Sequence, residues 1–488
     1  MISPSSDWSS ERIRSELGHP VIDADGHILE VMSAAQPYLR EALGPRVFQT
    51  YMEESSPHRS IVLGGGDVDR RLRSRSPQSA WWGTPARNTL DLATAALPQL
   101  MHERLGEFGI DFSVLYGTKA FGCASPADGE IRRGLCRGFN DYYAETYAPF
   151  ADRMTVAGII PMHTPEEAIA ELEHCKAIGL KAIGLPEGVL REIPEPERDH
   201  PSPFLMPGQT HWFDTFGLDS AHDYDLVWAK CEELGFAATC HGGMGCLSPF
   251  RFTSPSNYSY NHIGAFMDAM HRLVKSLFMG GVTRRFPNLP FAVLECGVGW
   301  ASILLADLVE HWEKRSLEGL ERLDPASIDW ALLEKRARQY GGTLFENVSE
   351  ADLRASLEAL PGTGRVPENL DDWRFLEISD EAELVSLFAD HFYFGCEADD
   401  RTLAFAFSEA NPAGARLRPV FSSDLSHWDV RDMSVVLSEA HGLVREGILE
   451  AEDFRDFVCR NPARLLTSQN PAFFDGTVLE SQAAELRN

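Results

Sequence analysis

Pro20-Val21-Ile22-Asp23-Ala24-Asp25-Gly26-His27 is the stretch of sequence that decides the fold. It has the form of a short apolar strand that ends in alternating polar side chains. Residues two apart on a strand point to the same side, so we expect Asp25 and His27 to face one common point. Barrel enzymes present a metal ion at the carboxyl ends of their strands in this way. The stretch therefore predicts a strand end that binds a metal ion.

Two later segments repeat this pattern. Residues 236–241 end in His241, and residues 420–424 end in Asp424, each after a strand-like apolar run. Imidazole and carboxylate are the side chains that bind zinc, manganese and iron in proteins. A short Asp-x-His motif by itself is more often a turn or a helix cap, but three such strand ends together indicate one shared site.

The rest of the chain predicts an α/β fold, a (β/α)8 TIM barrel with helical and loop insertions. We treat residues 1–488 as a single domain, because helix-like segments separate most of the candidate strands. Residues about 48–98, 187–222 and 314–385 do not fit the repeating unit and are predicted to be insertions. The first two follow strands one and four and should lie over the mouth of the barrel, whereas the third is equally suited to an oligomer contact. The eight candidate strands are residues 21–24, 112–116, 154–160, 180–185, 236–240, 291–294, 392–394 and 419–421.

The composition limits the partners and the compartment. The chain has 73 acidic and 44 basic residues and a formal net charge of -29, so its field should repel nucleic acids and anionic membranes. Nine cysteines without a CxxC pair are typical of reduced thiols in a cytoplasmic protein. We find no signal peptide and no apolar stretch of ~18 residues that could span a bilayer. We therefore expect a cytoplasmic protein that acts on a small molecule.

Nine segments in order resemble the amidohydrolase superfamily, in its amidohydrolase-related branch, which includes the aminocarboxymuconate-semialdehyde decarboxylase type. The resemblance implies a metal shell of Asp25, His27, His241 and Asp424, in which Asp424 also takes the proton of the attacking water. Asp25 stands where histidine is commonest, which favours iron or manganese somewhat over zinc. The segments that carry the resemblance are residues 21–30, 107–111, 140–142, 179–183, 241–243, 281–287, 295–300, 423–429 and 461–465.

Glu295 departs from the pattern of that family, whose decarboxylases carry a histidine at this place. A glutamate there could transfer a proton or act as an additional metal ligand. A structural role, bonded to backbone or to an arginine, is the alternative. His427 could orient Asp424 or contact substrate, and a surface histidine is nearly as good an explanation. His262 and His271 lie near or in a predicted amphipathic helix over 264–278, and either could join Glu295 to hold a second ion.

Three classes of function remain open from the sequence. The preferred one is a metal-dependent enzyme that hydrolyses a C–N, C–O or C–C bond of a small carboxylated or aromatic substrate, with non-oxidative decarboxylation next. A dinuclear non-haem iron or iron–manganese oxygenase on the same barrel is the second class. A non-catalytic subunit that pairs with a related chain is the third, and a homodimer is an expected assembly. Seven side chains could form the walls of the substrate pocket: Trp81, Trp82, Arg87, Trp212, Phe250, Arg251 and Trp300.

Overall fold

Eight parallel strands form a nearly closed barrel in the computed structural model, which describes residues 8–54, 67–78, 87–194, 208–243, 253–322, 324, 327–358 and 370–486. Each strand pairs with the next one along the barrel. The gap between the first and last strands is bridged by backbone hydrogen bonds, from Asp424 N–H to Asp25 O and from His27 N–H to Leu425 O, both 3.0 Å long. The barrel prediction is therefore confirmed. The strands are β1 (Ile22–Ile28), β2 (Phe112–Gly117), β3 (Met154–Ile159), β4 (Ala182–Pro186), β7 (Ala238–His241), β8 (Phe291–Leu294), β9 (Phe392–Cys396) and β10 (Arg418–Phe421).

The strands are short apolar runs because both of their faces are covered. Every residue of β1, β2, β4, β7, β8 and β9 is buried, as expected when helices pack on the outside and side chains fill the inside of a parallel barrel. β1 is longer than the predicted strand, which ended at Ala24. A shift in its register with β2 between Asp23 and Gly26 carries the strand on through Asp25 and His27.

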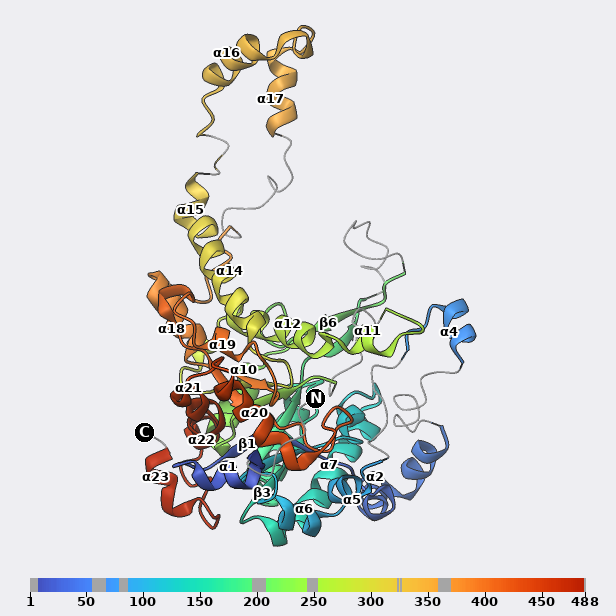
Figure 1. Ribbon diagram of the computed structural model, residues 1–488. Coiled ribbons are helices and arrows are strands. Elements are labelled where there is room, and N and C mark those ends of the chain that lie inside the picture. The colour runs from blue at the N-terminus through green and yellow to red at the C-terminus, as the bar shows by residue number, and fades with distance from the viewer. Residues whose placement is uncertain are drawn as a thin grey trace.

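Helices surround the barrel, as Figure 1 shows. Thr164 caps one of them: its hydroxyl oxygen accepts a hydrogen bond from Glu167 N–H at 3.3 Å, and α8 begins at Pro165. None of the helices in the described part of the chain is long and apolar enough to cross a membrane. The longer helices outside the insertions are α7 (Gly129–Tyr147), α8 (Pro165–Ala177), α10 (Asp225–Leu234), α12 (Ala265–Met279), α14 (Gly299–Arg315), α20 (Val436–Arg445) and α22 (Asn461–Ser468). The shorter ones are α1 (Ser10–Glu16), α6 (Pro98–Arg104), α11 (Tyr258–His262), α13 (Val282–Arg285), α19 (Leu403–Ala406), α21 (Ala451–Arg455) and α23 (Ala483–Leu486).

The first two predicted insertions contain local structure on the mouth side of the barrel. The first holds the end of α2 (Met32–Glu54), then α4 (Val68–Ser74) and α5 (Thr89–Ala96). It meets the segment that follows β7, because Gln78 N–H donates to Ser254 O at 2.8 Å and Arg71 Nε donates to Pro255 O at 2.8 Å. The second contains an antiparallel pair, β5 (Val189–Glu192) with β6 (His211–Asp214).

The third predicted insertion forms a helical arm. It projects away from the barrel beyond the end of α14, at the top of Figure 1. The chain then returns to the barrel, where α18 (Glu381–Ala389) leads into β9. We call residues 317–358 the arm; its helices are α15 (Leu317–Glu321), α16 (Trp330–Tyr340) and α17 (Glu350–Glu358).

Candidate metal centre

Four strands bring their carboxyl ends together around one buried point. Asp25 and His27 lie on β1, and His241 is the last residue of β7. Glu295 follows β8 directly, and Asp424 lies three residues after the end of β10. All five side chains are buried. The carboxyl ends of parallel barrel strands form the usual place of an active site.

The ligand atoms of these residues are spaced as they would be around a cation. His27 Nε2 lies 3.5 Å from Asp25 Oδ1 and 3.3 Å from Asp424 Oδ1. His241 Nε2 lies 3.1 Å from Glu295 Oε2 and 3.8 Å from Asp25 Oδ1. Two donors that are each ~2.1 Å from one ion stand roughly 3.0 to 3.4 Å apart in octahedral or tetrahedral geometry. The separations of 3.3 Å and 3.1 Å lie within this range, whereas the two to Asp25 Oδ1, 3.5 and 3.8 Å, are somewhat longer.

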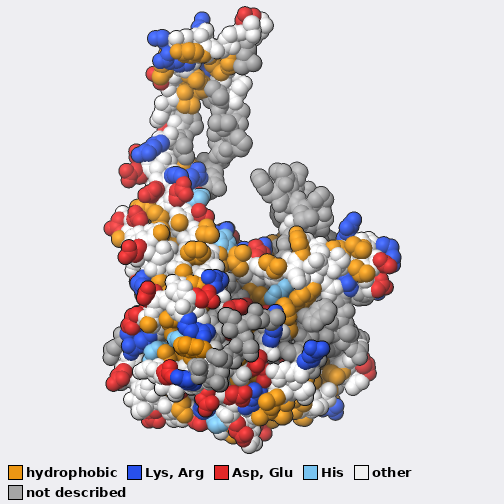
Figure 2. Space-filling view, in the orientation of Figure 1, with side chains coloured by type: hydrophobic (Ala, Val, Ile, Leu, Met, Phe, Trp, Pro, Cys, Tyr) orange, Lys and Arg blue, Asp and Glu red, His pale blue; other side chains and the backbone are white. Residues whose placement is uncertain are grey.

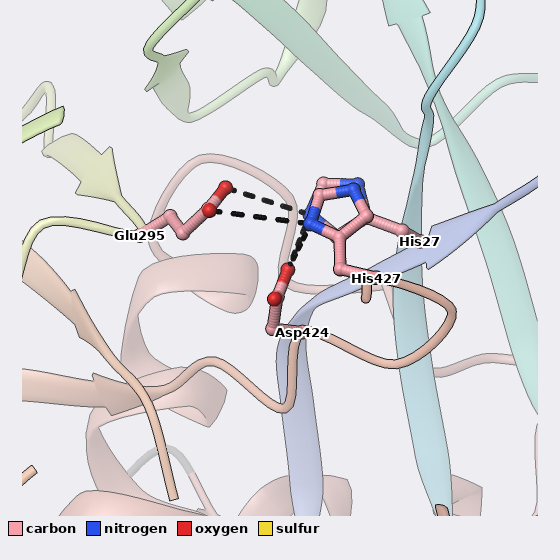
Figure 3. Close-up of side chains that lie close together, drawn as sticks. All are labelled: His27, Glu295, Asp424 and His427. Carbon is pink, nitrogen blue, oxygen red and sulfur yellow. Dashed lines mark ion pairs between the residues drawn. The ribbon is translucent and has the colours of Figure 1, made fainter. Parts of the chain in front are cut away.

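The donors form two overlapping groups, whose ligand atoms lie within 4.8 Å of one another. One group is Asp25, His27 and His241, and the other is His27, Glu295, Asp424 and His427, drawn in Figure 3. Asp25 Oδ1 is buried and accepts no hydrogen bond from the described residues, which is costly for a carboxylate unless a cation binds it. The residues present thus fit a divalent metal with mixed nitrogen and oxygen ligands.

The ligand side chains are held in place by a surrounding hydrogen-bond network. His241 Nδ1 donates to Gly242 O at 2.8 Å, so its Nε2 is the atom available to a metal. The second carboxylate oxygen of Asp25 accepts a hydrogen bond from the Ser422 hydroxyl. Asp23 lies two residues before Asp25 on β1 and is fully buried. Its part in this hydrogen-bond network was not expected from the sequence.

Two of the site residues adopt a strained backbone conformation. Glu295 has φ 53° and Asp424 has φ 52°, a left-handed region that residues other than glycine seldom occupy. Such conformations cost on the order of 1 kcal/mol or more each and cluster at functional sites, where the surrounding structure enforces them. Both residues lie at the carboxyl ends of their strands, Glu295 directly after β8 and Asp424 three residues after β10.

Burial controls the protonation of the cluster. It raises the pKa of Asp25 to about 7, with His241 opposing and Glu295 adding to the shift. It also raises the pKa of Asp424 well above the usual range, again with Glu295 contributing. The pKa of His27 and that of His427 are lowered well below normal by burial, so both rings are neutral, the form that binds metals. A bound cation would favour the ionised carboxylates.

His427 lies against Asp424 more closely than two ligands of one ion normally approach. Its Nδ1 is 2.5 Å from Asp424 Oδ1, its Nε2 is 3.3 Å from the Thr118 hydroxyl oxygen, and its ring stacks on that of His27 at 3.7 Å between centroids. His427 is therefore in direct contact with Asp424.

The two remaining predicted histidines lie outside both ligand groups. His262, at the end of α11, is partly buried among aromatic rings, 5.4 Å from the ring centroids of Tyr258 and Trp428. It is close to the site, because it lines the same cavity as Glu295. His271 lines a different cavity beside His311 and packs against the Trp300 ring. The structure thus does not bring His271 to the metal centre.

A cavity of about 850 Å³ adjoins the metal centre at Glu295. We call it the acidic cavity, because Glu295, Glu397, Asp399 and Asp400 line it. Glu397 was not expected from the sequence: it directly follows β9, but the predicted strand ended two residues earlier, at Phe394. Of the predicted pocket walls, Trp300 lines this cavity, while Arg87 and Trp212 do not. Trp81, Trp82, Phe250 and Arg251 lie outside the described residues.

Comparisons with known proteins agree with this architecture. Residues 117–350 match the family model described as Amidohydrolase, which confirms the resemblance seen in the sequence motifs. The matched region contains His241 and Glu295, whereas Asp25, His27 and Asp424 lie outside it. No curated protein matches the chain significantly.

Solved structures with a similar fold include three enzymes that cover nearly the whole chain. An amidohydrolase of Mycobacterium avium subsp. paratuberculosis K-10 is 14% identical, with 92% of this chain and 100% of that chain covered and a TM-score of 0.49. The 2,6-dihydroxybenzoate decarboxylase from Rhizobium is 14% identical, with 92% and 99% covered and a TM-score of 0.46. The 5-carboxyvanillate decarboxylase of Novosphingobium aromaticivorans DSM 12444, complexed with manganese, is 12% identical, with 95% and 100% covered and a TM-score of 0.46. At these identities the likeness concerns the fold alone.

Proposed function

We propose that this protein is a metal-dependent enzyme of the amidohydrolase type that hydrolyses a C–N, C–O or C–C bond of a small organic substrate. The observation that carries the proposal is the convergence of Asp25, His27, His241 and Asp424 beside a cavity large enough for such a substrate. Zinc, manganese and iron all suit this ligand set. A bound ion would supply a water of lowered pKa and would polarise the bond to be cleaved.

The side chains around the ion have distinct tasks in this proposal. Asp424 takes the proton of the attacking water, and His427, 2.5 Å away, holds its carboxylate in position. Glu295 lines the acidic cavity and also lies 3.1 Å from His241. Among the carboxyl groups of the metal centre it is therefore the one that can reach a substrate in the cavity. It delivers a proton to the leaving group.

The charge of the cavity favours hydrolysis over decarboxylation. A decarboxylase must bind a carboxylate, whereas the described residues that line the cavity include four acidic side chains and no lysine or arginine. The carboxylates of Asp399 and Asp400 repel an anionic substrate, and Glu397 adds to this repulsion once the pH exceeds its raised pKa of about 8. Non-oxidative decarboxylation is therefore the weaker alternative, and release of carbon dioxide from aromatic acids would support it.

Metal analysis of two ligand variants tests the proposal. We expect protein purified without added metal to contain zinc, manganese or iron, measured by elemental analysis. His241→Ala and Asp424→Ala should lose the metal and all turnover on a panel of amides and esters, with unchanged circular dichroism. His311→Ala, an exposed histidine outside the centre, serves as the control. Stoichiometric metal and full turnover in both ligand variants would refute the assignment.

An oxygenase with two metal ions is the second candidate function. It is favoured by the second group of donors, His27, Glu295, Asp424 and His427, which lies beside the first. Two irons per chain, together with oxygen uptake in the presence of a reductant, would support this function. One ion per chain and no oxygen uptake would exclude it.

A further inference from the structure

We propose that the acidic cavity selects a substrate with an apolar body and a positively charged, amine-type group. The inference deepens the proposed function and rests on it, because the cavity meets the metal centre at Glu295. The charge of this substrate is opposite to that of the carboxylated substrate expected from the sequence.

The walls of the cavity are suited to an apolar or aromatic body. Phe266 and Met267 from α12, Trp300 and Ile303 from α14, and Phe405 from α19 line it. Its volume of about 850 Å³ lies in the usual range of small-molecule sites. Ile303 and Phe405 are 66% and 55% exposed, so the apolar surface continues to the rim. Figure 2 shows hydrophobic side chains gathered over α12 and the adjoining part of α14.

The inner side of the cavity is suited to a cation. Asp400 Oδ1 accepts a hydrogen bond from Thr402 N–H at 2.8 Å, its Oδ2 is buried, and the Cys396 thiol lies against this carboxylate. The Oδ2 atom lies beside Gly297, where a Cβ atom would approach it to 3.0 Å. A buried carboxylate oxygen of this kind is stabilised by a charged N–H donor.

Two further features favour a cation. The indole N–H of Trp300 donates to Cys296 O at 3.0 Å, which fixes the ring in the wall of the cavity. Aromatic faces attract ammonium groups by about 0.5 to 2 kcal/mol. The net charge of -29 adds a long-range field that draws cations towards the protein.

Three matched probes test the charge preference: 2-phenylethylammonium, which has N–H donors, its neutral isostere propylbenzene, and phenylacetate. Binding is measured by tryptophan fluorescence and calorimetry at pH 8.5, on the protein as purified and with its metal content known. We expect the cation to bind with one-to-one stoichiometry and at least about fivefold more tightly than the neutral probe. Phenylacetate that binds as tightly as the cation would overturn the proposal.

Two variants localise the effect. Glu397→Gln should weaken binding of the cation by about five- to tenfold and leave the neutral probe unchanged. Asp399→Asn, at an exposed position of the same lining, should act in the same direction and is not expected to disturb folding. The control is Glu409→Gln, an exposed carboxylate beyond α19 in the same connection between β9 and β10; its side chain does not line the cavity, and the change should affect the binding of neither probe. Equal losses in all three variants would show that the net charge, and not the cavity, binds the cation, which would refute the proposal.

The outcome separates this inference from the proposed function. If the protein holds no metal but still prefers the cation in a manner that depends on Glu397, the cavity is assigned correctly and the proposed function fails. If metal and hydrolysis are present but the anion is preferred, the substrate class alone is wrong.

Discussion

Glu295 is the residue on which the chemistry of the site depends most. It is buried, has a left-handed backbone conformation, and lies 3.1 Å from His241 Nε2 at the edge of the acidic cavity. Its ion pairs join it to three histidines, His27 at 4.0 Å, His241 at 3.1 Å and His427 at 4.0 Å. Its strain is maintained by the strand that precedes it and by the packing around it.

We predict that Glu295→Gln lowers kcat by at least ~100-fold, because glutamine cannot transfer a proton. The pH dependence of the residual activity should lose one limb, as measured by kcat against pH between 5 and 9. Unaltered kinetics would assign Glu295 to the architecture of the barrel. A large loss together with loss of the metal would instead make it a ligand.

Glu397 predicts a dependence of stability on pH. Burial, with Glu295 and Asp429 adding to it, raises the pKa of Glu397 to about 8 from the usual value of 4.5. Asp399 and Asp400 also face it. At a pH between 4.5 and about 8 the unfolded chain has released this proton, while the folded chain retains it. The contribution of protonated Glu397 to the free energy of unfolding is therefore lost as the pH rises through 8.

We therefore expect Glu397→Gln to become more stable relative to the unchanged protein as pH rises from 5 to 9, with a gain in Tm of at least about 2 °C. Thermal melts followed by circular dichroism, at equal metal content, measure the difference. Glu409→Gln should show the same difference at both pH values. A gain that is equal at pH 5 and pH 9 would contradict the assigned pKa.

At the scale of elements, Asp23 links β1 to β10, the two strands on either side of the gap in the barrel. It accepts hydrogen bonds from the Ser113 hydroxyl on β2 at 2.6 Å, and from the Ser423 hydroxyl and backbone N–H after β10 at 2.7 and 3.0 Å. It also accepts one from Asp25 N–H at 3.2 Å. Asp23 thus connects β2 and the end of β10 to the part of β1 that bears the ligands. In this part of β1 the register with β2 is shifted.

We predict that Asp23→Ala destabilises the fold by about 1 to 3 kcal/mol, because it leaves buried donors without acceptors. It should also weaken metal binding by roughly 10- to 100-fold, as loss of a residue that supports a ligand commonly does. Denaturant unfolding and metal titration measure the two effects. Asp23→Asn keeps an acceptor in place and should be milder in both; metal affinity unchanged in Asp23→Ala would separate Asp23 from the centre.

At the scale of the whole molecule, the arm is separable from the barrel. Arg315 Nη2 lies 3.6 Å from Asp372 Oδ2, so the chain leaves the barrel and returns to it at nearby positions. The arm also exposes apolar side chains, among them Leu332 at 49% and Tyr340 at 72%. Contact of the arm with a second chain, one of the possibilities left open by the sequence, stays a prediction.

We predict that replacing residues 317–369 with a short glycine–serine linker leaves the barrel folded, with its metal content unchanged and Tm within about 3 °C. Surface loops tolerate such changes because closing a loop of a different length costs little. Melting curves and elemental analysis check the barrel, and light scattering checks whether a dimer is lost. A shortened chain that fails to fold would show that the arm stabilises the barrel.

The sequence by itself determined the eight strands and the residue types at their ends. Periods of two residues and apolar runs are local properties, so β8 was predicted with its observed limits and Asp25, His27, His241 and Asp424 could be singled out. The acidic cavity, the pairing of His427 with Asp424, the role of Asp23 and the separation of His271 from the centre were decided only by the tertiary structure. These features depend on distances between segments that are far apart along the chain, such as Asp23 and Ser423, and no local pattern encodes such distances.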